Sequence, residues 1–184
     1  VMQILSKATR IIAEGEVLQL SKVRDASTSE ETYMEVIRGK TAMLFEASSH
    51  SAAVLAGADE VQTEALRVFG DHLGVAFQLM DDLLDYRGDA QAMGKNVGDD
   101  LAEGKPTLRL IHAMREGTPA QAELVRKAIQ QGGSQDIESI RATVEAAGSL
   151  DYTAQLARDF AEKAIQCLST LPASQYRDAL TELT

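Results

Sequence analysis

Several residue types are scarce in this chain of 184 residues, and each shortage narrows what the protein can be. Tryptophan is absent, aromatic residues make up 4% of the chain, and the 3 prolines among many alanines favour helices. The single cysteine, Cys167, permits no internal disulfide and is typical of a reducing cytosol. No apolar run is long enough to span a membrane and no signal peptide precedes the chain, so we expect a cytoplasmic protein.

Basic side chains are also few. The 18 Lys and Arg residues face 28 Asp and Glu residues, and the resulting net charge of −10 argues against a general nucleic-acid surface. An acidic chain that handles phosphates must use a few placed lysines and a divalent metal ion instead of a basic field. With 45% hydrophobic residues the chain suits one globular domain. It starts at Val1 and not at Met, which suggests part of a longer protein.

Nearly all of the chain has helical periodicity. The apolar spacing, with cap residues such as Asp59 and Thr118 and breaks such as Gly57, predicts helices at about 2–20, 27–38, 40–56, 60–87, 107–115, 119–131, 135–147 and 150–170. Residues 88–106 form one long irregular segment rich in glycine, and such loops are often functional. No strand-like alternation occurs. We therefore expect an all-α helical bundle in a single domain.

Two glycines lie inside the longest predicted helix, at Gly70 and Gly74. Glycine weakens a helix interior, so its presence there needs a reason. We expect a neighbouring helix to approach this side closely.

The end of the same helix carries three acids in an apolar setting. The stretch FQLMDDLLDY (77–86) places Asp81, Asp82 and Asp85 in the pattern D-D-x-x-D. On a helix, Asp81 and Asp85 share a face, where like charges destabilise the helix. Burial of unpaired carboxylates is costly, whereas a hard cation such as Mg²⁺ prefers carboxylate, water and phosphate oxygens. The motif alone leaves open whether the acids bind metal or form a solvated helix edge.

Lysines beside glycines favour the first interpretation. Lys95 and Lys105 lie in the irregular segment, and Lys40 with Thr41 follows Gly39 at an expected helix break. Placed ammonium groups on flexible backbone suit diphosphate binding. Each lysine alone is a weak signal, but their occurrence together with D-D-x-x-D is specific.

At these residues the sequence resembles the trans-polyprenyl diphosphate synthases, and most closely the bacterial octaprenyl diphosphate synthases that make quinone side chains. The resemblance extends over essentially the whole chain and is carried by Gly39-Lys40-Thr41, by FQLMDDLLDY and by GKNVGDDLAEGKPTL (94–108). It implies an isoprenoid-synthase-type helical bundle that works as a homodimer. The first aspartate-rich motif of the family is absent. We therefore expect the C-terminal part of a single synthase domain, without its N-terminal helices and inactive by itself.

The resemblance also implies a reaction and its residues. The family condenses an allylic diphosphate, such as farnesyl diphosphate, with isopentenyl diphosphate, and uses Mg²⁺. Site residues carried over by the resemblance are Asp81 as main metal ligand, Asp85 and Asp82 as direct or water-mediated ligands, Lys40 and Lys95 as diphosphate ligands, Lys105 as a further candidate, and Thr41 and Gln78 beside the reacting carbocation. Arg109 stands where the family usually has proline; we expect it to alter the start of the next helix without removing a ligand.

Three other interpretations compete with this one. A ferritin-like di-iron protein needs Glu-x-x-His pairs, but Glu46 and His50 are four residues apart, and neither His72 nor His112 follows a Glu by three. A non-catalytic or regulatory subunit of a heteromeric prenyltransferase would keep the bundle, yet it would have no need of the acids and Lys95. A class I terpene cyclase shares the helical fold, but the Gly-Lys-rich segment after the acids disfavours it.

Overall fold

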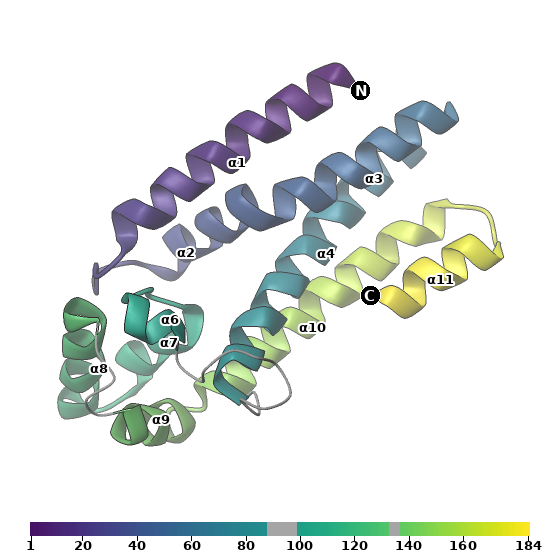
Figure 1. Cartoon of the computed structure of the whole chain (residues 1–184). Coiled ribbons are helices and arrows are strands. Elements are labelled where there is room, and N and C mark those ends of the chain that lie inside the picture. Colours follow the sequence, from purple (N-terminus) through teal and green to yellow (C-terminus); the bar gives the residue numbers. More distant parts are fainter. Residues whose placement is uncertain (88–98, 133–136) are drawn as a thin grey trace. The chain divides into compact units, whose positions relative to one another are not determined.

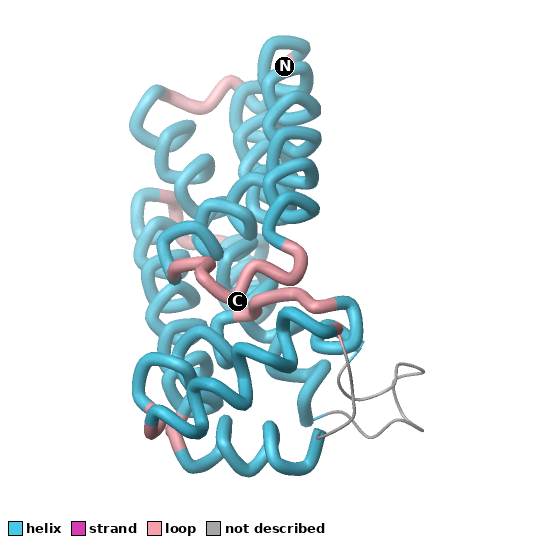
Figure 2. The backbone as a smooth tube through the Cα atoms, turned by 90° about the vertical axis from the view of Figure 1, so that its left-hand side faces the viewer, coloured by secondary structure: helices cyan, strands magenta, loops and turns pink. Residues whose placement is uncertain are grey.

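The structure is a computed structural model that describes residues 1–87, 99–132 and 137–184 (Figure 1). These residues form helices joined by short loops, and the described ranges contain no strand (Figure 2). The elements are α1 (Met2–Lys22), α2 (Glu30–Ile37), the π-helix η1 (Arg38–Ala42), α3 (Met43–Ala56), α4 (Glu60–Arg87), α6 (Asp99–Glu103), α7 (Leu108–Glu116), α8 (Pro119–Gln131), α9 (Ile137–Ala146), α10 (Ser149–Cys167), the 3₁₀-helix η2 (Leu168–Thr170) and α11 (Gln175–Leu183). The predicted all-α class is confirmed.

Contacts divide the chain into two compact units. Unit 1 comprises Val1–Glu16, Val36–Gln78 and Leu156–Thr184, and unit 2 comprises Val17–Glu35 and Leu79–Gln155. Helices α1, α2, α4 and α10 contribute residues to both units. The assignment of the chain to one synthase domain stays a prediction.

Local capping explains why several helices begin and end where the sequence predicts. Helix α4 spans the predicted range, and Asp59 caps it by accepting a hydrogen bond from the Gln62 backbone N–H at 2.8 Å. Thr118 and Gln121 form a reciprocal capping box at the start of α8, with Pro119 in the first turn. Helix α3 ends at Gly57, whose φ of 69° is left-handed and suits glycine.

Unit 1 depends on close approach between backbones. A Cβ added to Gly74 would lie 2.5 Å from the Ala42 Cα, and one added to Gly70 would lie 2.5 Å from the Phe45 carbonyl oxygen. The expected close packing against these glycines is therefore confirmed, with η1 and α3 as the neighbouring elements. Two small apolar clusters complete this unit, one around Ala8, Met43 and Ala47 and one around Phe69, Ala164 and Leu168.

Unit 2 has a larger core. Its buried members come from α4, α6, α7, α8, α9 and the start of α10, and include Leu83, Leu101, Leu110, Val125, Ile129, Ile140, Val144 and Leu150. Leu83 is 3% exposed and lies between the acids of the D-D-x-x-D motif. The apolar flank of that motif therefore anchors the end of α4 in the core.

Three elements differ from the predictions. The break expected at Gly39 is a π-helix that joins α2 directly to α3. The short helix α6 lies within the segment expected to be irregular, because Leu101 is buried in the core of unit 2. Helix α11 was not predicted, and none of its residues is buried. Residues 88–98, including Lys95, lie outside the described part.

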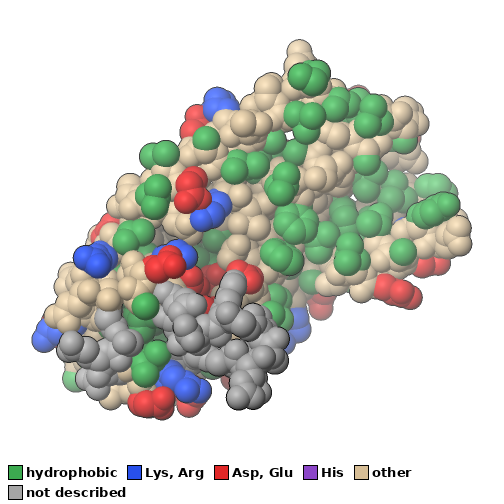
Figure 3. All heavy atoms as spheres, in the orientation of Figure 1, with side chains coloured by type: hydrophobic (Ala, Val, Ile, Leu, Met, Phe, Trp, Pro, Cys, Tyr) green, Lys and Arg blue, Asp and Glu red, His purple; other side chains and the backbone are tan. Residues whose placement is uncertain are grey.

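Some large apolar side chains remain on the surface of unit 1. Exposed examples on α1 and α3 are Met2, Leu5, Leu44, Val54 and Leu55. Figure 3 shows hydrophobic side chains gathered over α3 and the N-terminal end of α1. The expected homodimer stays a prediction. None of the helices in the described residues has the length and apolar character that a membrane crossing requires.

The contact at Gly74 gives a test of the packing in unit 1. We expect Gly74→Ala, in the complete native protein, to lower the free energy of unfolding by about 2–3 kcal/mol because the new methyl group overlaps η1. This loss should appear although Ala is favoured over Gly in a helix interior by about 1 kcal/mol. Urea denaturation followed by circular dichroism measures it.

Gly57→Ala is the control, because a Cβ there meets no atom within 4 Å and only the left-handed φ of 69° opposes it. Its expected cost is about 1 kcal/mol. A Gly74→Ala protein as stable as the wild type would contradict the close approach.

Candidate functional site

The three acids of the motif occupy the last turns of α4. Asp81, Asp82 and Asp85 lie in the part of this helix that belongs to unit 2. The C-terminal end of a helix carries partial negative charge, so carboxylates there are opposed by the backbone as well as by each other. Their charge needs compensation, and the structure shows where part of it comes from.

Asp82 is held by a tyrosine. Its side chain is buried, with the residue 6% exposed, and its Oδ2 accepts a hydrogen bond of 2.6 Å from the Tyr33 hydroxyl. Burial and the neighbouring Asp82 charge raise the pKa of Tyr33 well above its usual value, so the phenol stays protonated and remains a donor. The hydrogen bond makes a buried carboxylate tolerable.

Asp85 is held by an arginine from the next long element. The Arg109 Nη2 lies 3.0 Å from Asp85 Oδ2, and the two side chains are 2% and 8% exposed. The other end of the guanidinium, Nη1, donates to the backbone carbonyl of Asp82. Arg109 is the second residue of α7, so this ion pair joins the start of α7 to the end of α4. The expectation that Arg109 removes no ligand stays a prediction, and the structure adds that Arg109 pairs with Asp85, one of the predicted ligands.

Asp81 is half-buried, whereas Asp82 is buried. Its carboxylate is the oxygen donor that Mg²⁺ prefers, with water and substrate phosphate to complete the shell. Among the described residues, no cluster of three or more His, Cys, Asp or Glu side chains is arranged to hold a metal ion by itself. Carboxylates of this kind would suit a metal shared with a phosphate ligand, and the role of Asp81 as main metal ligand stays a prediction.

Lys105 forms ion pairs with two acidic residues of unit 2. Its Nζ lies 2.7 Å from Glu103 Oε2 and 3.1 Å from Asp100 Oδ1. Burial lowers the pKa of Lys105, but the bonds to Glu103 and Asp100 outweigh it and the pKa is raised. The lysine is therefore charged, and its contacts order the turn that precedes α7. Lys95, the other lysine predicted in this segment, lies outside the described residues.

In unit 1 the structure brings two predicted residues together. The Thr41 hydroxyl donates a hydrogen bond of 2.9 Å to the Gln78 Oε1. Lys40, the residue before Thr41, pairs with Glu16 on α1 at 2.7 Å, and both side chains are partly exposed. The hydrogen bond engages the Gln78 amide oxygen and so restrains the orientation of the amide.

A glycine contact positions Lys40. A Cβ on Gly15 would lie 2.6 Å from the Lys40 backbone nitrogen, and one on Gly39 would lie 3.2 Å from the Gly15 Cα. Only glycine on both sides allows α1 to touch the π-helix. π-Helical turns inside helices occur frequently at functional sites, and this one carries Lys40 and Thr41.

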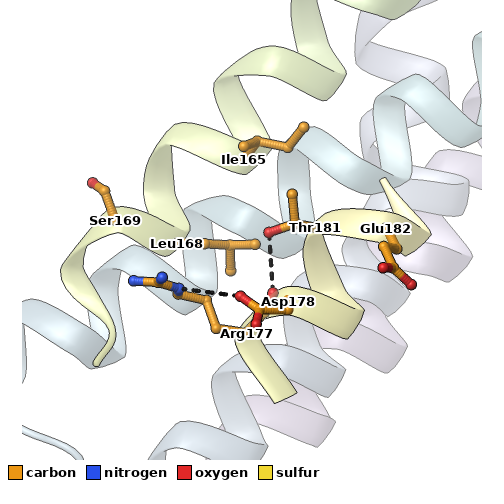
Figure 4. Close-up of a pocket in the computed structure, with 7 residues that line it drawn as sticks. All are labelled: Ile165, Leu168, Ser169, Arg177, Asp178, Thr181 and Glu182. Atoms are coloured by element: carbon orange, nitrogen blue, oxygen red, sulfur yellow. Dashed lines mark hydrogen bonds and ion pairs between the residues drawn. The ribbon is translucent and has the colours of Figure 1, made fainter. Parts of the chain in front are cut away.

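A surface hollow of about 480 Å³ lies elsewhere in unit 1, beside α10, η2 and α11 (Figure 4). It is lined by Ile165, Leu168, Ser169, Arg177, Asp178, Thr181 and Glu182. None of the predicted site residues belongs to this lining. Its polar groups already engage one another, because Thr181 donates to the Arg177 carbonyl at 3.0 Å and Arg177 faces Asp178 at 4.0 Å. We assign no function to this hollow.

Sequence reasoning missed the roles of Tyr33, Glu16 and Arg109. Tyr33 and Glu16 lie far from the motifs in sequence, and nothing in their local pattern indicates their partners. Arg109 gave a usable signal, since a charged residue between Leu108 and Leu110 at the start of an apolar helix must either face solvent or find a buried acid.

Comparisons with known proteins agree with these observations. The family model for Polyprenyl synthetase matches residues 1–147. An octaprenyl diphosphate synthase of Haemophilus influenzae is 51% identical over 184 residues, which cover 100% of this chain and 56% of that protein. The Escherichia coli octaprenyl diphosphate synthase is 50% identical, with 57% of its length covered. The chain thus spans little more than half the length of these relatives.

Solved structures give the same result. A polyprenyl synthase from Caulobacter crescentus, crystallised with calcium and isoprenyl diphosphate, matches 99% of this chain and 56% of its own, with a TM-score of 0.92 and 46% identity. A decaprenyl diphosphate synthase from Rhodobacter capsulatus matches with a TM-score of 0.92 and 41% identity, over 99% of this chain and 57% of its own. The predicted family resemblance and helical fold are both confirmed.

The Tyr33–Asp82 hydrogen bond provides a test of the site's construction. We expect Tyr33→Phe to lower the free energy of unfolding by about 1–3 kcal/mol, because it removes the donor from a buried carboxylate. Chemical denaturation of the complete native protein measures the change.

Tyr176→Phe is the matched control, because it deletes the same atom from a tyrosine that is 75% exposed. Its expected effect is within about 0.5 kcal/mol. Equal stability of the two variants would show that the buried hydroxyl contributes nothing.

Proposed function

Because the chain belongs to the polyprenyl synthetase family, we propose that the complete protein elongates an allylic diphosphate, such as farnesyl diphosphate, with isopentenyl diphosphate. The observation that carries this proposal is the D-D-x-x-D motif at the end of α4, where Tyr33 and Arg109 make two closely spaced carboxylates tolerable. The similarity to octaprenyl diphosphate synthases supports a long all-trans product, octaprenyl diphosphate, for quinone side chains.

In this mechanism the carbon–oxygen bond of the allylic diphosphate breaks and leaves a carbocation. The double bond of isopentenyl diphosphate attacks that carbon head-to-tail, and the released diphosphate accepts the proton whose loss forms the new double bond. The difficult event is ionisation, since the departing diphosphate accumulates negative charge that must be neutralised. Mg²⁺, when bound, supplies charge neutralisation of this kind.

The chain's own residues would prepare that ionisation. Asp81 is the principal metal ligand, and Asp85 and Asp82, which also contact Arg109 and Tyr33, are direct or water-mediated ligands. Lys40 and Lys95 bind diphosphate oxygens as compact charges, and for Lys40 this requires release of its surface pair with Glu16. An ion pair between such partly exposed side chains contributes little stability, so its replacement by a contact with diphosphate costs little free energy.

Thr41 and Gln78 have a different role in this proposal. Their hydrogen bond of 2.9 Å presents two oxygens that can stabilise positive charge on the reacting carbon. Neither side chain titrates, so the pair would not act as a base that removes a proton from the carbocation. Lys105, which is paired with Glu103 and Asp100, acts in ordering the turn before α7 and not in direct substrate contact.

The exposed apolar side chains on α1 and α3 suit packing against further protein. We place the homodimer interface expected of the family among these exposed faces of unit 1. The 184-residue chain alone should lack turnover, because a single acidic motif cannot supply the second half of the family's metal site.

The role of Asp81 can be tested directly. We expect Asp81→Ala to abolish magnesium-dependent condensation in the complete protein, with a rate loss of at least about 1000-fold. Incorporation of radiolabelled isopentenyl diphosphate with farnesyl diphosphate as acceptor measures it, and chromatography of the product gives its chain length.

Asp178→Ala is a suitable control, because it removes the same group from a side chain that is 70% exposed in unit 1. The control should retain near-normal turnover. Normal turnover by Asp81→Ala would remove the residue from the proposed mechanism, whereas a short product would change only the assigned chain length.

A further inference from the structure

We propose that Arg38 is a positioning residue for the condensation, which holds the π-helix η1 against α4 so that Thr41 meets Gln78. The inference deepens the proposed function and rests on its assignment of Thr41 and Gln78 to the reacting carbon. Arg38 acts on the reaction through its partner Asp71 and through Thr41, and not by contact with a substrate.

One face of α4 meets η1 at three successive positions. Three residues of α4 are spaced i, i+3 and i+7 and therefore share this face: Asp71, Gly74 and Gln78. They contact three residues of η1, which are in turn Arg38, Ala42 and Thr41. The first contact is an ion pair, the second a close backbone approach and the third a hydrogen bond of 2.9 Å. All six residues belong to unit 1, so the ion pair and the proposed reaction site lie on one continuous surface of α4.

Arg38 also closes the π-helical turn. Its carbonyl accepts a hydrogen bond from the Met43 N–H, five residues further along the chain. The turn includes Gly39, which has no side chain to pack, and π-helical turns are rare, so neighbouring elements must fix this one. Because one residue supplies both the carbonyl of the turn and the side chain that reaches α4, a shift of Arg38 would displace Lys40 and Thr41 as well.

A second partner restrains the Arg38 guanidinium. Its central carbon lies 5.4 Å from the centre of the Phe160 ring in α10, within the range of a cation–π interaction. The ring is only 7% exposed, so the surrounding residues restrain it. A planar guanidinium can stack on an aromatic face and donate to the Asp71 carboxylate, which the compact ammonium group of lysine cannot match.

The exposure of the ion pair distinguishes positioning from stabilisation. The Arg38 side chain is 40% exposed and the Asp71 side chain 17% exposed. Ion pairs that water reaches contribute little to folding stability. Reaction rate is far more sensitive to small displacements of the groups around a reacting carbon. Loss of the pair should therefore lower turnover while the protein stays folded, whereas a purely structural contact would lower stability alone.

A double-mutant cycle in the complete native protein tests this inference. The variants Arg38→Gln, Asp71→Asn and Arg38→Gln/Asp71→Asn remove the partners singly and together. Incorporation of radiolabelled isopentenyl diphosphate with farnesyl diphosphate as acceptor gives kcat and KM, and urea denaturation gives the stability of each variant. Arg126→Gln is the matched control, because it removes the guanidinium of an ion pair in unit 2 whose arginine is 45% exposed.

We expect each single variant to lower kcat/KM by about 10-fold or more, mainly through kcat. The double variant should lie within about 2-fold of the weaker single variant, because one contact is lost in all three, whereas independent roles would multiply to about 100-fold. Addition of Arg38→Gln to a Thr41→Val protein should also cost less than about 2-fold, since the hydroxyl to be positioned is already gone. Arg126→Gln should retain turnover within about 2-fold of the wild type.

Two results would overturn the inference and leave the proposed function intact. One is wild-type turnover by Arg38→Gln, and the other is a loss that multiplies with that of Asp71→Asn or Thr41→Val. Normal turnover by Thr41→Val would refute the role proposed for that threonine, and the inference with it. If Arg38→Gln does not fold, Asp71→Asn decides in its place, alone and combined with Thr41→Val, because it keeps the arginine.

Discussion

Negative charge at the end of α4 is the constraint to which much of unit 2 responds. Three carboxylates lie where the helix itself presents partial negative charge. Burial of Leu83 holds this end of α4 in the core, so the acids cannot all turn towards solvent. The Tyr33 hydroxyl donates a hydrogen bond to Asp82, and the Arg109 guanidinium forms an ion pair with Asp85. The position of α2 and the start of α7 are thus tied to the chemistry of the motif.

In unit 1, backbones approach one another closely enough to fix the positions of short polar side chains. Gly74 meets Ala42, and Gly15 meets Gly39, at distances that no Cβ would allow. As a result, a threonine and a glutamine on neighbouring elements form a direct hydrogen bond of 2.9 Å. The small residues allow the backbones to approach closely, and this close packing holds the polar side chains beside them in fixed positions.

Most of the helices follow from local signals in the sequence. Helix α4 was predictable because Asp59 marks its start and apolar residues recur along its length, and α8 because Thr118, Pro119 and Gln121 define its first turn. Helix α11 was missed although Ser174 caps its start by accepting a hydrogen bond of 3.2 Å from the Arg177 N–H.

The site was predictable only in part. The motif identified which residues carry the chemistry, but the partners Tyr33 and Arg109 come from distant segments, and no periodicity encodes such pairs. The π-helix likewise depends on Gly15, a residue of another helix. Long-range contacts, not local propensity, decide these features.

The π-helix also bears on how this region tolerates insertions and deletions. In η1 the Met43 N–H bonds to the carbonyl of Arg38, five residues back, so the turn holds one residue more than an α-helical turn. Loss of one residue here would close the turn into a regular α-helical turn, and the helical residues directly on either side would keep nearly the same alignment, because the wide turn absorbs one extra residue. A shortening by one residue would thus act mainly inside η1, where it would change the positions of Lys40 and Thr41 and disturb the hydrogen bond from Thr41 to Gln78.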